Sequence, residues 1–231
     1  MDPGRISELL RPFLDHGAEA PDRAFKRGLS PSQLQSISIY IDILLRWNVR
    51  VNLTAIRQPE ELVTRHFGES LFVAQHLFPA ASPGGSAEQA SPVNVIDLGS
   101  GAGFPGLPIK LWAPQIHLTL IESNQKKAIF LREVVRTLAL ANVDVFAGRA
   151  DALAATGEDG DILTLRAVER FEAIIPTAAD LVVPGGRMAI LIGETQLGPL
   201  RRLTPSFQWG KTTLLPQSSG RFLTIGTKES S

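Results

Sequence analysis

The sequence predicts an α/β fold with a doubly wound, mostly parallel sheet, a C-terminal antiparallel hairpin and an N-terminal helical cap. Two observations support this. Apolar runs alternate with helical patterns, which is typical of a parallel sheet covered by helices, at 93–98, 117–122, 143–146, 161–165 and 187–192. Near the end of the chain, the segments 211–215 and 221–227 flank a turn at 217–220, and this pattern predicts an antiparallel hairpin.

The strongest helix signal lies ahead of these strands. Ser30-Pro-Ser-Gln33 combines an N-cap, a proline at the first helical position and a capping-box glutamine. Apolar residues then follow at helical spacing, namely Leu34, Ile37, Ile41 and Leu44. We therefore expect a helix over 31–47.

The chain divides into three parts. We expect further helices over 59–77 and 6–14, so that residues 1–78 form the helical cap. Residues 79–92 are rich in Pro, Gly, Ser and Ala and predict a linker. The α/β domain then spans 93–231.

Composition excludes several classes of protein. The 231 residues are 44% hydrophobic and 20% charged, which is enough for a substantial core. Because neither an apolar stretch of about 18 residues nor a signal-peptide pattern is present, we expect a cytoplasmic protein. Without cysteines and with four scattered histidines, no metal site is expected. Lys plus Arg equals Asp plus Glu at 23 each, so a nucleic-acid partner would need a local basic face.

The most informative segment follows the first strand of the domain. The strand ends on Asp97, and Gly99, Gly101 and Gly103 come directly after it. Closely spaced glycines allow positive φ and a near approach of the backbone to a ligand. Pro105 then supplies a φ suited to the first turn of a helix. A strand, a glycine loop and a helix N-terminus together predict a nucleotide-type cofactor site.

The type of cofactor depends on the residues before the loop. Gly101-Ala-Gly-Phe-Pro-Gly106 matches the dinucleotide pattern G-x-G-x-x-G, but Gly99 and Ser100 precede it and shift the register. Asp97 would repel a diphosphate, whereas it would attract an ammonium and a sulfonium. These features favour S-adenosylmethionine over a dinucleotide; a turn that binds nothing is the third interpretation. Glu122 ends the next apolar run, where this fold presents an acid to ribose hydroxyls.

Five segments carry a resemblance to a known family: 45–55 (LRWNVRVNLTA), Arg65-His66, 97–108 (DLGSGAGFPGLP), 122–127 (ESNQKK) and 148–151 (GRAD). In combination they resemble the ribosomal RNA small subunit methyltransferase G family. The resemblance implies a Rossmann-like class I S-adenosylmethionine-dependent methyltransferase that methylates N7 of a guanine in bacterial 16S ribosomal RNA. The expected partner is 16S rRNA or the small ribosomal subunit, with no membrane or DNA partner, and the expected state is a monomer.

The resemblance also implies roles for individual residues. Arg166, at the end of the fourth strand, is expected near the reacting centre, as a catalytic and a cofactor-binding residue. The other cofactor-binding candidates are Asp97, Gly99, Gly101, Gly103, Phe104 and Glu122, with Ala150 and Asp151 beside the adenine. The candidates that face the RNA are Lys126, Lys127, Arg149 and Arg221.

Two positions depart from the family pattern. Leu165 stands where the family usually has a serine before Arg-Ala, and Ile192 stands where it usually has a lysine before glycine. Ile192 removes a cation from the expected RNA face, and Glu194 adds a negative charge. A methyltransferase of another substrate, or a degenerate S-adenosylmethionine-binding protein, is therefore the alternative.

Guanine N7 has an in-plane lone pair and no proton to lose, so transfer needs no general base. Orientation alone can contribute about 7 to 11 kcal/mol, and we expect Arg166 to position the base or act electrostatically. Arg166 and Arg149 are candidates to bind N7 and O6, with a structural ion pair as the alternative. A non-enzymatic RNA-binding module using Trp47, Arg50 and Asn52 is a further hypothesis, although we expect Trp47 in the core.

Overall fold

A mixed sheet forms the centre of the computed structural model, which describes residues 1–15, 28–79, 92–168 and 170–230. Within these residues the sheet has eight strands in the order β3-β2-β1-β4-β5-β8-β6, and β7 pairs with β8. The first five strands in this order are parallel to one another, and β8 is antiparallel to β5, β6 and β7. The strands are β1 (Asn94–Leu98), β2 (His117–Ile121), β3 (Val143–Phe146), β4 (Gly160–Arg166), β5 (Val182–Gly193), β6 (Phe207–Trp209), β7 (Thr213–Leu214) and β8 (Arg221–Lys228).

The five apolar runs of the sequence correspond to β1–β5, and the predicted hairpin is formed by β7 and β8. The α/β fold with a mostly parallel sheet is therefore confirmed. Two details differ. β5 begins at Val182 rather than 187, because its first residues pair with the start of β4 across an irregular register at Gly160. The strand β6 was not expected, because its three residues are too few to show an alternating pattern.

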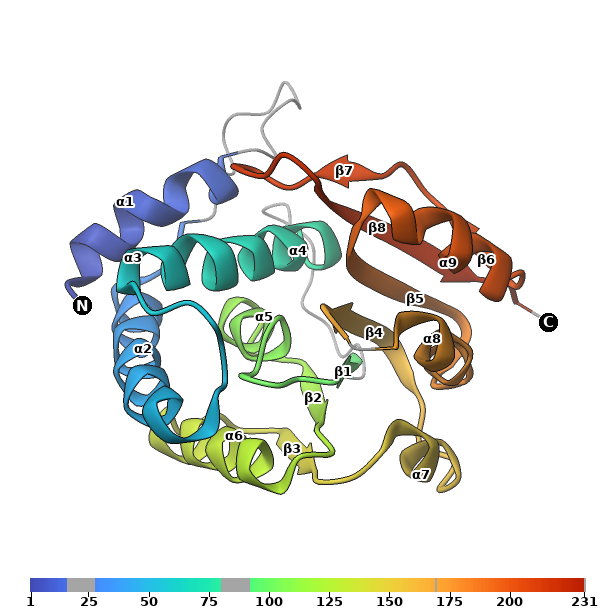
Figure 1. The fold of residues 1–231 in the computed structure, drawn as a ribbon, viewed down its shortest axis with the longest axis horizontal. Helices are drawn as coiled ribbons and strands as arrows, with labels where there is room; N and C mark the ends of the chain where they lie inside the picture. Colours follow the sequence, from blue (N-terminus) through green and yellow to red (C-terminus); the bar gives the residue numbers. More distant parts are fainter. Residues whose placement is uncertain (16–27, 80–91, 169, 231) are drawn as a thin grey trace.

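Helices cover both faces of the sheet, as Figure 1 shows. One hydrophobic cluster joins the N-terminal helices to α5, α6 and the sheet, and a second lies under α7, α8 and α9. The helical elements are α1 (Pro3–Leu14), α2 (Pro31–Val51), α3 (Pro59–Leu62), the π-helix η2 (Val63–Gly68), α4 (Glu69–Leu77), α5 (Gly106–Trp112), α6 (Gln125–Thr137), α7 (Ala150–Ala154), α8 (Phe171–Asp180), the 3-10 helix η3 (Glu194–Gln196) and α9 (Leu197–Leu203).

The capping signal at Ser30 is confirmed. Ser30 Oγ accepts from the amide of Gln33 at 3.2 Å, and Gln33 Oε1 accepts from the amide of Ser30 at 2.7 Å. The helix α2 continues four residues beyond the predicted end and stops at Asn52, which adopts the left-handed conformation. Asparagine tolerates this conformation and can therefore end a helix.

The predicted helix over 59–77 is not a uniform α-helix. It consists of α3, the π-helical η2 and α4 in direct succession. Gly68, at the end of η2, lies against the ring of Phe13 in α1, and an added Cβ would lie 2.6 Å from two ring carbons. This close packing holds η2 against α1.

The N-terminal helices share a core with the sheet domain. Trp47 of α2 is partly buried, packs against the hydrophobic core and lies edge-on to Phe130 of α6 with ring centroids 5.8 Å apart, in agreement with its expected packing role. Residues 80–91 of the predicted linker lie outside the described residues. In the described parts of the chain, no helix combines the length and hydropathy needed to span a membrane.

Candidate functional site

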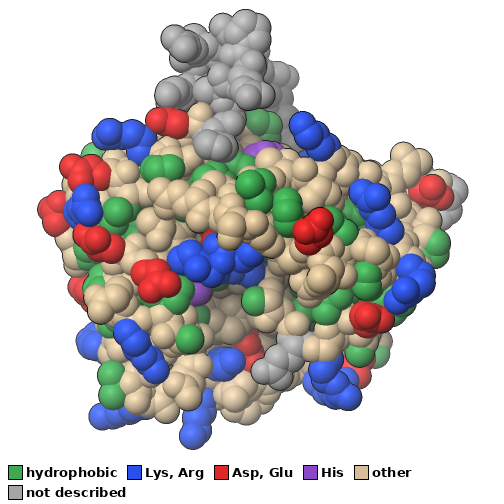
Figure 2. Space-filling view, turned by 45° about the horizontal axis from the view of Figure 1, so that its top comes forward, with side chains coloured by type: hydrophobic (Ala, Val, Ile, Leu, Met, Phe, Trp, Pro, Cys, Tyr) green, Lys and Arg blue, Asp and Glu red, His purple; other side chains and the backbone are tan. Residues whose placement is uncertain are grey.

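A cavity of about 720 Å³ lies at the carboxyl ends of the parallel strands. Its walls come from the segments that follow β1, β2, β3 and β4 and, on the side of the N-terminal helices, from Leu53, Thr54 and His66. In open α/β sheets, ligands bind at this edge. Figure 2 shows Lys and Arg side chains beside a hollow near the middle of one face of the molecule.

The glycine loop forms one wall of this cavity. Gly99, Gly101 and Gly103 all have positive φ, at 70°, 57° and 86°, a conformation that strains other residues. A Cβ added to Gly101 would meet nothing nearer than the Gly99 carbonyl oxygen at 3.8 Å. A Cβ on Gly103 would clash with the Tyr40 hydroxyl of α2 and would lie 2.6 Å from Cδ1 of Leu107 in α5. Gly99 and Gly101 line the cavity, whereas Gly103 allows the loop to pack on both α2 and α5.

The loop is held from two directions. The amides of Gly99 and Ser100 donate to the carbonyl of Ile121, both at 3.0 Å, and the amide of Gly101 donates to Glu122 Oε2 at 2.9 Å. From the other side, the hydroxyl of Tyr40 in α2 donates to the carbonyl of Ala102 at 2.5 Å. The conformation of the loop thus depends on both β2 and α2.

Asp97 lies behind the loop and does not line the cavity. Side chains alternate along a strand, so Asp97 shares with Val95 the face toward α5, where it packs against Gly106. Oδ1 accepts from Thr164 Oγ1 at 2.8 Å, and Oδ2 is buried without a hydrogen-bond partner. Burial raises the pKa of Asp97 to about 6, although the hydrogen bond from Thr164 opposes the rise. A direct contact between Asp97 and a ligand in the cavity is therefore not supported.

The other acidic candidates lie in the cavity wall. Glu122 is largely buried, and its Oε1 accepts from the amide of Asn124 at 2.7 Å. An ionised carboxylate has about four acceptor positions, so Glu122 can accept further hydrogen bonds from a ligand. Ala150 and Asp151 line the cavity at the start of α7. The exposed Asp151 pairs with Arg149 at 3.1 Å, and this contact lowers the pKa of Asp151.

Two aromatic rings also line the cavity: Phe104, which was expected to bind the cofactor, and His66, to which the sequence assigned no role. The ring of His66 stacks on Phe104 at 4.7 Å between centroids, and Phe104 in turn stacks on Tyr40 at 5.5 Å. His66 Nε2 lies 2.8 Å from Thr54 Oγ1. Burial, followed by the charges of Arg166 and Arg65, lowers the pKa of His66 to about 3. His66 is therefore neutral at physiological pH.

Thr54 and His66 line the cavity together with Leu53. Leu53 and Thr54 belong to the motif 45–55, and His66 belongs to the motif Arg65-His66. The family resemblance was the only feature of the sequence that pointed to these three residues. Asn48 fixes Thr54 in place, since its side chain donates to the Thr54 carbonyl at 2.9 Å and accepts from the Thr54 amide at 3.0 Å.

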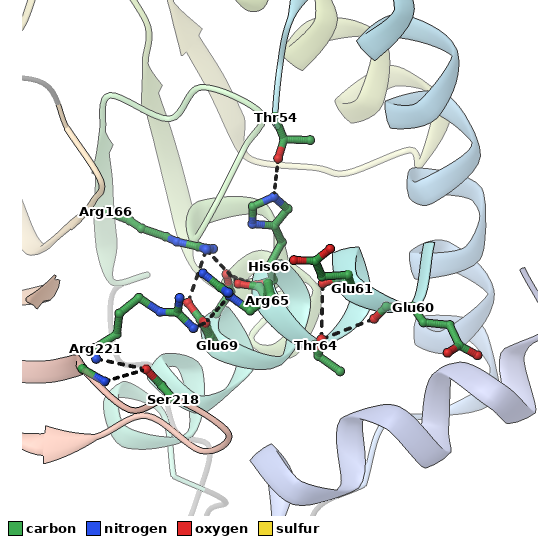
Figure 3. A network of polar contacts seen from close by, with 12 residues as sticks. Thr54, Glu60, Glu61, Thr64, Arg65, His66, Glu69, Arg166, Ser218 and Arg221 are labelled. Atoms are coloured by element: carbon green, nitrogen blue, oxygen red, sulfur yellow. Dashed lines mark hydrogen bonds and ion pairs between the residues drawn. The ribbon is translucent and has the colours of Figure 1, made fainter. Parts of the chain in front are cut away.

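Arg166 lines the cavity and belongs to a group of charged side chains that we call the arginine cluster: Arg65, Arg166 and Arg221 around Glu69 (Figure 3). The alternation along β4 places Arg166 on the same face as Ile162 and Thr164, toward the N-terminal helices. Burial lowers the pKa of Arg166 and Glu69 opposes the shift. Its Nη1 is buried without a hydrogen-bond partner.

The four RNA-facing candidates are not brought together. Lys127 and Arg149 line the cavity, Lys126 is exposed on α6 outside it, and Arg221 belongs to the arginine cluster. The two departures from the family pattern, Leu165 and Ile192, are buried in the core beneath α7, α8 and α9. Over the described ranges 1–15, 28–79, 92–168 and 170–230, no group of three or more His, Asp or Glu side chains is placed to hold a metal ion.

Comparison with known proteins identifies the family. The model of the family described as rRNA small subunit methyltransferase G matches residues 33–218. The chain belongs to this family. The protein named ribosomal RNA small subunit methyltransferase G from Xanthomonas axonopodis pv. citri is 38% identical over 187 residues, covering 78% of this chain and 82% of that protein. The protein of the same name from Stenotrophomonas maltophilia is 40% identical over 188 residues, covering 81% and 82%.

Solved structures agree on the fold. The YcgJ protein from Bacillus subtilis has a TM-score of 0.55 at 12% identity, covering 72% of this chain and 100% of that chain. TYW2 from P. horikoshii, solved in complex with MeSAdo, has a TM-score of 0.54 at 15% identity, covering 71% and 63%. The family expected from the sequence is thus confirmed, and the interpretation of Gly101–Gly106 as a dinucleotide fingerprint is set aside.

Proposed function

We propose that this protein transfers a methyl group from S-adenosylmethionine to N7 of a guanine in 16S ribosomal RNA. Membership of the rRNA small subunit methyltransferase G family supports the reaction class. The observation that carries the proposal in the structure is the position of Arg166, which lines the same cavity as the glycine loop and keeps a buried, unpaired Nη1.

The residues of the cavity fit S-adenosylmethionine. The open space beside Gly101 is a cradle that any Cβ would begin to fill, and Gly99 and Phe104 continue the wall. We assign Glu122 to the ribose hydroxyls and the start of α7, at Ala150 and Asp151, to the adenine. Asp97 acts on this site only through the field of its charge and through its packing under Gly106. When bound, the cofactor supplies a methyl carbon on a positively charged sulfur.

The protein needs to orient the guanine rather than to activate it. The N7 lone pair is the nucleophile and no proton leaves, so a general base is unnecessary. A guanidinium that donated to N7 would block that lone pair. Arg166 therefore donates to O6 through Nη1. Of the two guanine acceptors, N7 and O6, only O6 is free to accept this hydrogen bond during the transfer. His66 is neutral and stacked on Phe104, and together they provide a flat apolar wall beside the base.

The surroundings of the site suggest how the protein meets its substrate. Lys127, Arg149 and the arginine cluster are cations at or near the cavity, and we assign them, with Lys126, to the phosphates of the RNA. We propose that the protein acts as a monomer, in the cytoplasm, on 16S rRNA or the small subunit, without DNA or a membrane. Light scattering of the purified protein tests the monomer.

The decisive experiment is methylation in vitro, with labelled S-adenosylmethionine and small subunits from cells that lack the gene, followed by mass mapping of the RNA nucleosides. We expect a single new N7-methylguanosine in 16S rRNA. Cofactor binding without any labelled RNA would instead indicate a methyltransferase of another substrate or a degenerate binder. Loss of the same nucleoside on deletion of the gene is the matching observation in cells.

A further inference from the structure

Glu69 joins three arginines that lie far apart in the sequence. Its side chain is 1% exposed. Arg65 Nε lies 3.4 Å from Oε1, Arg166 Nη2 lies 3.2 Å from Oε2, and Arg221 Nη2 donates to Oε1. As Figure 3 shows, these side chains reach Glu69 from η2, from the end of β4 and from the start of β8. One buried carboxylate therefore links the cavity wall to the N-terminal helices and to the C-terminal hairpin.

The π-helix η2 supplies a second contact to the same arginine. In an α-helix the amide of Glu69 would donate to the carbonyl of Arg65. Here it donates to the carbonyl of His66, and the Arg65 carbonyl accepts from Arg166 Nη2 at 2.7 Å. π-helical turns occur frequently at functional sites. The irregular turn thus provides a backbone acceptor for Arg166 beside the carboxylate of Glu69.

The arginine cluster has more positive charge than its contacts neutralise. Three guanidinium groups surround one carboxylate, which leaves a formal charge of +2. Arg166 Nη1 and Arg221 Nε are buried without hydrogen-bond partners. Like charges this close repel one another, so the three side chains need Glu69 to stay together. The two unpaired donors are buried as the side chains stand, so an acceptor of a bound molecule reaches them after a small shift of either guanidinium.

We propose that Glu69 is a positioning residue: with the carbonyl of Arg65, it holds Arg166 and Arg221 in the orientation that receives the RNA beside the cofactor cavity. This inference rests on the proposed function. Glu69 itself lies beneath the guanidinium groups, and it acts on the reaction through them.

The variant Glu69→Gln separates positioning from charge balance. If the carboxylate only balanced charge, its removal would make the cluster more positive, so that RNA would bind more tightly at unchanged kcat. If Glu69 positions the arginines, the loss of its carboxylate should instead slow the reaction, and we expect kcat on 16S rRNA to fall about 10- to 100-fold. Calorimetry should give a Kd for S-adenosylmethionine within about threefold of wild type.

Two further variants provide the controls. Glu69→Asp keeps the charge with a shorter reach and should recover part of the lost kcat. Glu61→Gln makes the same change of charge at an exposed position on α3 and should retain the wild-type kcat. Thermal melts verify folding. If Glu69→Gln does not fold, Glu69→Asp carries the test, with kcat below wild type and cofactor affinity retained.

A wild-type kcat in Glu69→Gln, or in Glu69→Asp where that variant carries the test, overturns the inference. Tighter RNA binding with unchanged kcat does the same, as does an equal loss of cofactor affinity and kcat. These results leave the proposed function in place. By contrast, wild-type protein that binds S-adenosylmethionine but methylates no 16S rRNA overturns the proposed function, and the role of Glu69 falls with it.

Discussion

The glycine loop and the arginine cluster lie beside the same cavity and are built in different ways. The loop consists of consecutive residues, and its shape comes from backbone conformations that suit glycine. The cluster is assembled from side chains that are distant in the sequence, such as Glu69 and Arg221, which are 152 positions apart, and it is held by attraction to one buried carboxylate. We therefore expect changes in the loop to alter stability and cofactor affinity, and changes in the cluster to alter transfer to RNA.

Arg166→Lys is expected to give the largest effect. Lysine keeps the charge but presents its three donors from one nitrogen rather than from a planar fork, so it cannot span the separate positions that Nη1 and Nη2 of Arg166 occupy. We expect kcat/KM for rRNA to fall about 10²- to 10³-fold. Affinity for S-adenosylmethionine should fall by about tenfold at most, the equivalent of one hydrogen bond. Single-turnover methylation and calorimetry measure the two; equal losses in both would contradict the division between loop and cluster.

Two alanine variants of the glycine loop test whether changes there act on stability and cofactor affinity. Gly103→Ala places a methyl against the Tyr40 hydroxyl and 2.6 Å from Leu107 Cδ1 at a φ of 86°, so we expect a loss of about 2 to 4 kcal/mol in unfolding free energy. Gly101→Ala meets open space and should lose about 1 to 2 kcal/mol from its backbone conformation alone. Its methyl group should reduce cofactor affinity more than it reduces stability. Urea denaturation and calorimetry test the pair, and equal stability of the two variants would show that Gly103 is not held by packing.

The low pKa of His66, which arises from burial and from the charges of Arg166 and Arg65, makes the stability of the protein depend on pH in the acid range. The folded pKa, about 3, lies below the ordinary value of 6.5, so the unfolded chain binds a proton that the folded chain does not. This contribution to stability is complete above pH 6.5 and is lost as the pH falls toward 3. At pH 5 the loss is about 2 kcal/mol. His66→Gln should reduce the difference in unfolding free energy between pH 7 and pH 5 by that amount; an identical difference in the variant would disprove a buried, neutral imidazole.

The smallest effects are expected from the lysines of α6. Lys127 lines the cavity and Lys126 does not. Each alanine variant should raise the KM for rRNA about two- to threefold and lower the salt slope of binding by about 1. Filter binding at several salt concentrations measures the slope. We expect the larger change for Lys127→Ala, and a larger change for Lys126→Ala would place the RNA path outside the cavity.

The sequence predicts best what depends on neighbouring residues. The capping box at Ser30, the strands β1–β5 and the glycine loop are local patterns, and the structure contains them. Glu69 lies in a segment that looks like an ordinary amphipathic helix, and its burial depends on Arg166 and Arg221, which are distant in the chain. The direction of the Asp97 side chain could have been predicted from the sequence. Alternation along β1 places this side chain with Val95 on the face toward α5 rather than toward the cavity.

The hydrogen bond from Tyr40 to the carbonyl of Ala102 spans 62 positions and fastens the glycine loop to α2. A molecule that stabilises the loop conformation therefore also stabilises the packing of α2 against the loop, since both depend on this hydrogen bond. Trypsin should accordingly cleave after Arg46 and Arg50 in α2 more slowly once the methyl donor is added, and Tyr40→Phe should weaken that protection.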